Sequence, residues 1–329
     1  MQKRWNLFLL SLISLSPCGA CAARRENELG PPPEFLFEPR MEAIASNCSD
    51  RKPGMKPAIG NRSFALKPGN EAPYAVTKKE EVTLTQKEVA ALTVMSDPSS
   101  EVNVKGISGA DWKLSFCATG EGDSESEARE ALKRVLLERV GSTVLLRIPS
   151  QIGAPMCKGS LLVEAPKSAP LVIHASYGAV SVLDMSGPLR VAATHARAKI
   201  LDVGGQVSVM AAVVDFAGSR GEADLSADAE INLKVTATRF NGRLMGRAQG
   251  PVRMLIPPGF TSSFEAVVSS PRDFVCRADF CAKVKHKRQN NLHIFRYAGE
   301  GSASQGPVLK LRSETAAVVI YGTDRLAKR

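Results

Sequence analysis

The feature that most constrains the fold is a series of short alternating runs, each of which follows a glycine. Gly187, Gly205, Gly221 and Gly250 each lead into a run in which apolar residues alternate with polar or small ones. The first three of these glycines lie 18 and 16 residues apart, and no helical pattern intervenes. Alternation with a period of two indicates half-buried strands, and near-constant spacing indicates a repeat in which each unit packs on the next. We therefore predict a coil of stacked short strands, with a β-sandwich as the structural alternative.

Small residues support the stacked arrangement. The runs Val191-Ala-Ala-Thr194 and Met210-Ala-Ala-Val213 would fit the limited space inside a narrow coil. Glycine permits the positive φ angles that a sharp corner requires. The glycines are therefore expected at the corners, where one strand turns into the next.

The first half of the folded part combines strands with one helix. Residues 81–85, 91–94 and 101–106 alternate apolar with polar side chains, which predicts strands. Ser124 followed by Glu127 has the spacing of a capping box, and Gly141 is suited to a helix C-terminus. Apolar residues recur at helical spacing between them, so we predict an amphipathic helix over residues 125–140.

The N-terminus has the layout of a secretory signal. Lys3 and Arg4 precede an apolar stretch from Leu7 to Leu15, and Ala20-Cys21-Ala22 forms a small-residue cleavage site. Cys21 also allows a second interpretation, in which the signal is cut before the cysteine and its thiol is lipidated. The sequence leaves open a lipid anchor at Cys21 or ordinary cleavage near Ala22.

Composition then divides the chain. Residues 1–22 are the predicted signal peptide, and residues 23–75 are rich in Pro, Gly and charge, which predicts a disordered tether. Residues 76–322 form the predicted β body, with strands and the helix over 76–165 and glycine-punctuated units over 166–322. No later stretch approaches the about 20 apolar residues of a membrane-spanning helix, so we expect no transmembrane span after signal removal.

Cysteine usage suggests disulfides rather than metal. The chain has seven cysteines and an exported protein can form disulfides. We expect one bridge between Cys276 and Cys281 and another between Cys117 and Cys157, with Cys48 left over. The histidines are scattered and paired C-x-x-C motifs are lacking, so neither a metal nor another cofactor is predicted.

The clearest candidate contact site is a basic segment near the C-terminus. Its cations are Lys283, Lys285, Lys287 and Arg288, and several cations at close spacing attract a polyanion. The alternative is an exposed edge strand that its lysines protect from aggregation. Arg239, Arg243 and Arg247 could extend the segment.

The aromatic residues near the basic segment do not suggest nucleic-acid binding. Phe280, Phe295 and Tyr297 fall on alternating positions, which indicates core residues rather than surfaces on which bases stack. Nucleic acid is therefore not expected as a partner.

Catalytic chemistry finds little support in the sequence. Glycoside hydrolysis needs two suitably spaced carboxylates, and stacked strands could bring Asp202, Asp215 and Glu230 together. Acidic residues at strand ends are, however, ordinary turn residues. His174 and His195 lack a nucleophile motif beside them, so we predict no catalytic residues.

The glycine-led runs also resemble a known family. Gly178-Ala-Val-Ser-Val182, Gly205-Gln-Val-Ser-Val209 and Gly250-Pro-Val-Arg-Met254 are similar to segments of the bacterial putative-adhesin domain family, a domain of unknown function. Gly306-Pro-Val-Leu-Lys-Leu311 and Ala317-Val-Val-Ile-Tyr-Gly322 resemble its final strands. The resemblance covers roughly residues 76 to 322. It implies a right-handed parallel β-solenoid on an exported protein, often lipid-anchored, without catalytic residues.

These observations predict an exported, non-enzymatic protein that displays a β-solenoid surface for binding or adhesion. Its net charge of +10 favours acidic partners, either an acidic polysaccharide or an envelope protein. Its expected location is the periplasm, the outer membrane surface or the medium. The alternatives are a carbohydrate-active β-helix enzyme and a purely structural envelope protein.

Overall fold

The computed structural model describes residues 31, 37, 74–96, 100–148, 157–299 and 308–323. The chain divides into two compact units, residues 1–31 and 32–329, and the fold described below belongs to the second. The predicted signal peptide, Cys21 and almost all of the predicted tether lie outside the described residues. None of the helices in the described ranges has the length and apolar character needed to cross a bilayer.

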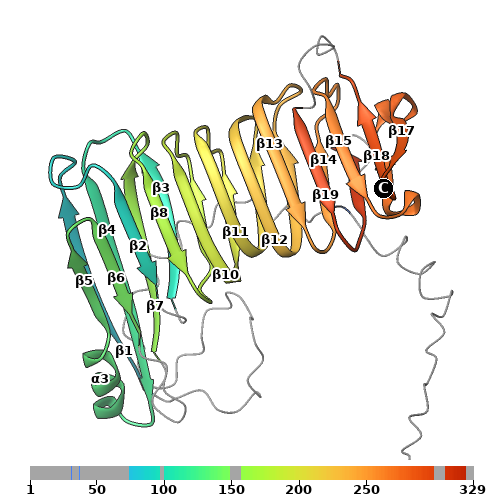
Figure 1. Ribbon diagram of the computed structural model, residues 1–329. Coiled ribbons are helices and arrows are strands. Elements are labelled where there is room, and N and C mark those ends of the chain that lie inside the picture. The colour runs from blue at the N-terminus through green and yellow to red at the C-terminus, as the bar shows by residue number, and fades with distance from the viewer. Residues whose placement is uncertain are drawn as a thin grey trace, which may run out of the picture. The chain divides into compact units, whose positions relative to one another are not determined.

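The protein is mainly β, as the alternating runs predicted, and its strands form two ladders (Figure 1). The first ladder runs in the order β5 (Leu136–Val140), β6 (Thr143–Arg147), β2 (Leu92–Ser96), β8 (Leu171–Ala175), β10 (Leu189–Leu201), β11 (Gln206–Gly218), β12 (Arg220–Val235), β13 (Asn241–Ala248), β19 (Leu309–Ser313), β15 (Phe264–Val268), β18 (Leu292–Tyr297) and β17 (Lys285–Gln289). The pairs from β6 to β15 are parallel, while β5, β18 and β17 are joined antiparallel at the ends.

The second ladder contains the remaining strands and the second halves of the longest ones. Its order is β1 (Tyr74–Leu84), β4 (Trp112–Gly122), β7 (Cys157–Pro166), β3 (Ser100–Ile107), β9 (Val180–Leu183), β10, β11, β12, β14 (Val252–Ile256), β20 (Val318–Gly322) and β16 (Phe274–Arg277). Pairing is parallel from β7 to β16. Strands β10 and β11 pass from the first ladder into the second where their register shifts, near Ala193 and Ala211.

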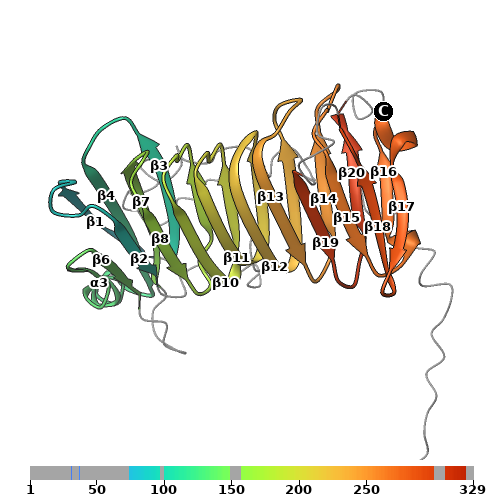
Figure 2. The ribbon, with the colours of Figure 1, turned by 45° about the horizontal axis from the view of Figure 1, so that its top comes forward.

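The order of strands in space departs from their order in the chain at both ends of the ladders. Strands β2 and β3 lie between β6 and β7 on one side and β8 and β9 on the other. Near the other end, β19 and β20 lie between β13 and β14 and the earlier strands β15 and β16 (Figures 1 and 2). The last strands of the described chain are therefore inserted ahead of strands that precede them in the sequence.

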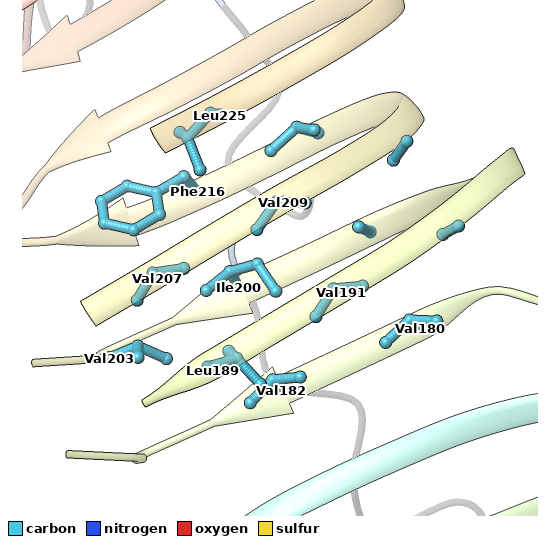
Figure 3. Packing of buried hydrophobic residues seen from close by; sticks show 14 of the residues in the cluster. Val180, Val182, Leu189, Val191, Ile200, Val203, Val207, Val209, Phe216 and Leu225 are labelled. Atoms are coloured by element: carbon cyan, nitrogen blue, oxygen red, sulfur yellow. The ribbon is translucent and has the colours of Figure 1, made fainter. Parts of the chain in front are cut away.

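The core lies between the two ladders and is built from the apolar half of each alternating run. Leu189, Val191 and Ile200 of β10 are 2 % exposed or less, and Phe216 of β11 pairs in register with Ile200 (Figure 3). Burying a side chain of this size stabilises the fold by roughly 1.5–3 kcal/mol. Because parallel neighbours repeat the same pattern in register, the inward residues form continuous rows along the stack.

Close contact between corners explains why glycine recurs. A Cβ atom on Gly205 would lie 2.4 Å from the carbonyl oxygen of Gly187, and one on Gly242 would lie 2.2 Å from that of Gly221. Gly221 and Gly242 also have positive φ angles of 102° and 132°, which side chains disfavour. The corners therefore require glycine mainly because each one rests on the backbone of the previous corner.

The predicted helix is shorter than expected. Helix α3 spans Glu125–Lys133, and Ser124 caps it by accepting a hydrogen bond from the backbone of Glu127 at 3.2 Å. Residues 136–140 instead form β5, which pairs with β6 through a tight turn at Gly141, whose φ is 61°. Gly141 therefore serves a hairpin and not a helix end. The spacing of apolar residues over 135–140 is compatible with a helix and with a strand. Hydrogen bonding to β6 stabilises the strand.

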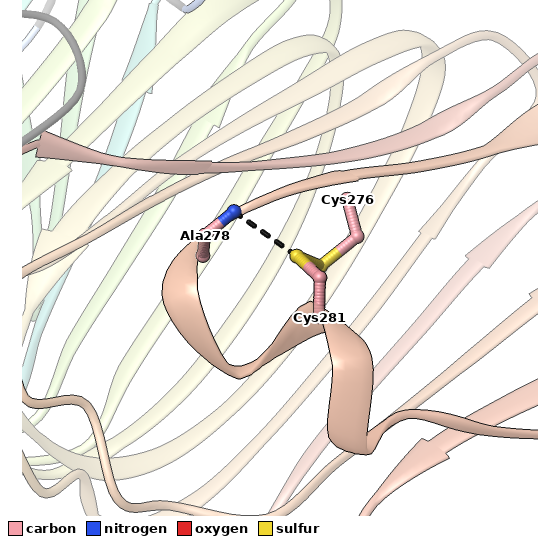
Figure 4. Close-up of a disulfide and its surroundings, with 3 residues drawn as sticks. All are labelled: Cys276, Ala278 and Cys281. Carbon is pink, nitrogen blue, oxygen red and sulfur yellow. Dashed lines mark hydrogen bonds between the residues drawn. A yellow bond between two sulfur atoms is a disulfide. The ribbon is translucent and has the colours of Figure 1, made fainter.

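One of the two expected disulfides is present. Cys276 and Cys281 are joined with their Cα atoms 5.7 Å apart, and Cys281 Sγ also accepts a hydrogen bond from the Ala278 backbone (Figure 4). The bridge links β16 to the short 3-10 helix η3 (Asp279–Lys283), which follows a similar turn, η2 (Pro271–Asp273).

The expected bridge between Cys117 and Cys157 was wrong. Cys157 is a free thiol, whereas Cys117 is in a disulfide whose partner lies outside the described residues. Across the β4–β7 pair, Cys117 faces Ser160 and Cys157 faces Gly120. The two cysteines are therefore offset by three residues, about 10 Å along the strands, which exceeds the reach of a disulfide.

Candidate binding surfaces

The basic segment of the sequence lies on the terminal strand of the first ladder. Lys283 ends η3, and Lys285, Lys287 and Arg288 lie on β17, all of whose residues are exposed. Strand β17 is joined to β18 by a two-residue turn at Asn290 and Asn291, whose φ angles of 48° and 62° are typical of a type I′ hairpin. The segment is thus an exposed edge strand, with β18 its only described partner.

The four cations are almost free of competing contacts. The three lysines form no ion pair with any residue that the structure describes. Arg288 donates only to the Asn291 side chain, at 3.3 Å, in the same part of the chain. Their charge is therefore available to an external anion. This arrangement is compatible both with binding and with protection of an edge strand, the two interpretations that the sequence left open.

A histidine pair lies on the other side of the same hairpin. His286 Nε2 and His293 Nδ1 are 2.9 Å apart, and the His286 ring stacks on Phe295 with 4.6 Å between centroids. Loss of solvation, together with the charges of His286 and Arg288, lowers the pKa of His293. A hydrogen bond between the two nitrogens needs one donor and one acceptor, so at least one of the two rings must be neutral. The lowered pKa of His293 favours a neutral ring.

The arginines considered as an extension of the basic segment do not reach it. Arg243 and Arg247 lie on β13, and three strands (β19, β15 and β18) separate β13 from β17.

Phe280 and Tyr297, two of the aromatic residues predicted to belong to the core, are buried. They are 8 % and 7 % exposed, and their rings stack with 4.4 Å between centroids. These rings fill the end of the core and are not stacking sites.

The acidic residues considered for catalysis are only partly brought together. Asp215 accepts a hydrogen bond from Arg197 at 2.7 Å and another from Asn232 at 2.9 Å, and Asn232 also donates to Glu230 at 3.0 Å. Asp202 lies apart at a corner, with a φ of 52°.

The Asp215 carboxyl is shielded from solvent. It is 0 % exposed, and its burial raises its pKa, with the nearby Glu230 charge adding to the effect while Arg197 and Asn232 oppose it. A carboxyl with both oxygens occupied and no exposed surface cannot contact a polymeric substrate. This cluster, on the outer face of the second ladder, therefore has the geometry of a stabilising network.

Another residue packs on the outer face of the second ladder. Phe37, within the segment predicted as a tether, is buried against Leu201 and Ala217, and the ammonium of Lys234 lies 5.8 Å from the centre of its ring. We call this outer face, with the Asp215 cluster and the Phe37 contact, the sealed face.

The outer face of the first ladder is different, and we call it the open face. The large apolar residues that stay exposed in the described chain all belong to it or to its rim. They are Met95, Leu136, Val140, Tyr177 and Met210. Monomeric proteins rarely gather exposed apolar residues on one face without a function, so the open face is a second candidate binding surface.

Two grooves cross the open face. The larger, of about 640 Å³, lies over β6, β2, β8 and β10, with Met95, His174 and Ala192 in register along its floor. The smaller, of about 420 Å³, is bordered by Arg190, Asp224 and other residues of β8 to β13. His174 is thus a solvated groove residue, and His195 stacks on Tyr177 with centroids 4.8 Å apart.

Sequence reasoning missed both grooves. The available signal was that outward positions of the alternating runs hold Met95 and Met210, where polar residues are expected in a solvated strand. The sequence alone did not reveal that these positions face the same surface, because Met95 and Met210 are 115 residues apart in the chain.

Comparison with known proteins does not assign a function. No protein-family model matches the chain, and no curated protein matches it. Similar solved structures include a putative cell adhesion protein from Clostridium sporogenes, with 9 % identity, a TM-score of 0.31, and coverage of 75 % of this chain and 98 % of that one. A putative adhesin from Parabacteroides merdae has 12 % identity and a TM-score of 0.28, with 75 % and 94 % covered.

A third similar structure carries a different description. It is a putative lipid binding protein from Parabacteroides distasonis, with 9 % identity, a TM-score of 0.27, and coverage of 74 % of this chain and 96 % of that one. Similarities this low transfer neither a fold nor an activity, so the function must be argued from the surfaces of this chain.

Proposed function

We propose that this chain is an exported, non-enzymatic protein that binds an acidic polymer through its basic segment. In this proposal residues 76–322 form a right-handed parallel β-solenoid, whose stacked strands hold the binding surface in a fixed shape. The observation that carries the proposal is the terminal strand β17, where Lys285, Lys287 and Arg288 are exposed together. Lys283 adds a fourth cation just before it.

The spacing of these cations suits a repeating anion. On a strand, alternate residues point to the same side about 6.6 Å apart, so Lys285 and Lys287 present two charges on one face. Interactions of exposed charges are individually weak and are screened by salt, but several along one polymer add up. An acidic polysaccharide has the required repeated charge, and an acidic envelope protein is the alternative partner.

The test measures retention of the full mature chain on immobilised hyaluronan, a polymer with one carboxylate per disaccharide, as salt is increased. Changing Lys283, Lys285, Lys287 and Arg288 to Gln should markedly lower the salt concentration at which the chain is released. The matched control changes Arg190, Arg239, Arg243 and Arg247 to Gln, which removes the same net charge elsewhere. Equal losses in both variants would show that only net charge matters and would contradict a specific site.

The absence of catalysis is part of the proposal and needs its own experiment. Asp215 and Glu230 lie close together through Asn232, but Asp215 is shielded. We expect no depolymerisation of a panel of acidic and neutral glycans by the purified chain. Depolymerisation that disappears in Asp215→Asn and Glu230→Gln variants would establish the carbohydrate-active alternative instead.

Export is tested by the mass of the mature N-terminus. A lipid-modified Cys21 would place the protein on a membrane surface, and an unmodified chain that begins near Ala22 would place it in the periplasm or the medium. Recovery of the full-length chain with its N-terminal 22 residues intact would contradict export.

A further inference from the structure

We propose that the larger groove of the open face binds a saccharide that carries an anionic group, such as an oligosaccharide containing a uronic acid. This site is distinct from the basic segment, and it does not depend on the polymer binding proposed above. Three features of the groove support it: an exposed pair of stacked rings, an even mixture of apolar and polar lining residues, and an arginine that forms no ion pair within the described residues.

The stacked rings lie where the groove meets the corner of the stack. Tyr177 follows the groove residue Ser176, and His195 follows the groove residue Thr194. The two rings are 4.8 Å apart at an interplanar angle of 27°, and a backbone hydrogen bond of 2.9 Å from His195 to Ser176 holds the two corners together.

This pair provides a rigid aromatic surface. Tyr177 is 59 % exposed although it is large and apolar, so its ring does not serve the core. The apolar C–H face of a pyranose packs well on such a ring, and a ring already held in place loses little conformational entropy when a ligand binds. The Tyr177 ring is therefore suited to one sugar residue.

The groove itself mixes apolar and hydrogen-bonding groups at the scale of a sugar ring. Ala192 lies in register between His174 and Met210, and its small side chain leaves the depression between them. The apolar part of the lining includes Met95, Leu145 and Ala192, and the polar part includes His174, Ser176 and Thr194. An alkyl chain would leave these polar groups without partners, which is costly, whereas a saccharide presents both kinds of surface.

The charge of the groove selects for an anionic ligand. Arg147 lines it, and none of the described residues that line it is acidic. Across the ranges that the structure describes, Arg147 takes part in no ion pair. A guanidinium can hold a carboxylate through two parallel hydrogen bonds. The groove volume of about 640 Å³ lies within the range of roughly 300–1,000 Å³ that is typical of small-molecule sites.

The test uses calorimetric titration of the full mature chain with two probes. One is a hyaluronan tetrasaccharide, which carries glucuronate, and the other is tetra-N-acetylchitotetraose, which is similar in size and uncharged. We expect the acidic probe to bind more tightly. Tyr177→Ala should weaken the binding of both probes by about five- to tenfold, because one stacking contact is worth about 1–1.5 kcal/mol. Arg147→Gln should weaken only the acidic probe, by about tenfold.

Matched controls separate the groove from its surroundings. Arg190→Gln removes an exposed arginine of the smaller groove and should not change the affinity for either probe. The variant with Gln at 283, 285, 287 and 288 should bind the tetrasaccharide normally. That result separates this proposal from the proposed function, since each can fail without the other.

Three outcomes would overturn the proposal. The first is that the unaltered chain binds neither probe, or that the Tyr177→Ala variant, with an unchanged circular dichroism spectrum, binds both probes as tightly as the unaltered chain does. The second is a dimer, measured by light scattering, that Tyr177→Ala and Arg147→Gln dissociate, which would assign the face to a second copy. The third is competitive displacement of the tetrasaccharide by laurate, which would assign the groove to an alkyl chain.

Discussion

The open face and the sealed face are formed by the same strands, yet they differ in what their outward residues do. On β11 and β12, the sealed face holds Asp215 and Asn232, both 0 % exposed, whereas the open face holds exposed Met210 and Asp224. Both sets occupy the outward positions of an alternating run. The comparison shows that an outward position can contribute to stability or remain available for a ligand, and that the period of the strand does not decide between the two.

The largest expected difference between the faces concerns their aspartates. Asp215→Ala removes a buried carboxyl that accepts hydrogen bonds from Arg197 and Asn232. It should lower the free energy of unfolding by about 2–3 kcal/mol. The loss is no larger because Arg197 is partly exposed and can be resolvated. The control Asp224→Ala on the open face should change the free energy of unfolding by less than about 0.5 kcal/mol. Denaturant unfolding measures both, and equal effects would abolish the distinction between the faces.

A smaller effect is expected at Phe37. Phe37→Ala removes a buried ring from Leu201 and Ala217 and should cost about 2 kcal/mol, less than the loss of a ring from a central core because the site can be resolvated. Tyr177→Ala, the matched removal of an exposed ring from the open face, should cost less than about 0.5 kcal/mol. An unchanged unfolding midpoint for Phe37→Ala would show that this contact does not stabilise the sealed face.

The pH dependence of stability gives a finer test of the sealed face. The pKa of Asp215 is raised above 3.8, chiefly by burial, so the folded protein holds this proton more tightly than the unfolded chain. The contribution of Asp215 to stability is therefore largest below pH 3.8 and falls as the pH rises through the raised pKa. Asp215→Asn should remove that fall.

The measurement compares unfolding free energies of the two proteins over a series of pH values. The stability of the unaltered protein relative to Asp215→Asn should decline as the pH rises from below 3.8. A constant difference, or one of opposite slope, would contradict burial as the dominant influence on this carboxyl. Asp224→Asn serves as the control on the open face.

The smallest expected effect concerns the hairpin at the end of the open face. Protonation of His293 adds charge beside Arg288, so the chain should be retained on hyaluronan to higher salt as the pH falls. The pKa of His293 is lowered, so this gain should come at a lower pH than for an ordinary histidine. His286→Gln with His293→Gln should remove the pH dependence while leaving retention at neutral pH, and a persistent dependence would assign it to other groups.

The sequence predicted much of the local structure because alternation directly reports which residues face inward. Leu189 and Val191, in the run that follows Gly187, were assigned to a strand by that pattern and are buried. The helix start at Ser124 was also predicted correctly, since its cap is a local hydrogen bond. The helix end was wrong, because residues 136–140 suited both periods and pairing with β6 determined the outcome.

Of the candidate sites, the basic segment was visible in the sequence because its cations are contiguous. The saccharide groove was not, because its residues come from β2, β6, β8 and β10, and their alignment depends on β2 lying between β6 and β8. The disulfide between Cys276 and Cys281 followed from short spacing. The offset that keeps Cys117 from pairing with Cys157 is set by strand register, which the sequence did not reveal.

The sequence by itself therefore determined the strands, their inward rows and the glycine corners, because these follow from backbone geometry and from the burial of nearby apolar residues. Only the tertiary structure decided which strands are neighbours, as in the insertion of β19 and β20 before β15 and β16. It also decided which outward face is sealed and which is open. The physical reason is that parallel neighbours make similar backbone hydrogen bonds in any order, so contacts between distant segments select one arrangement.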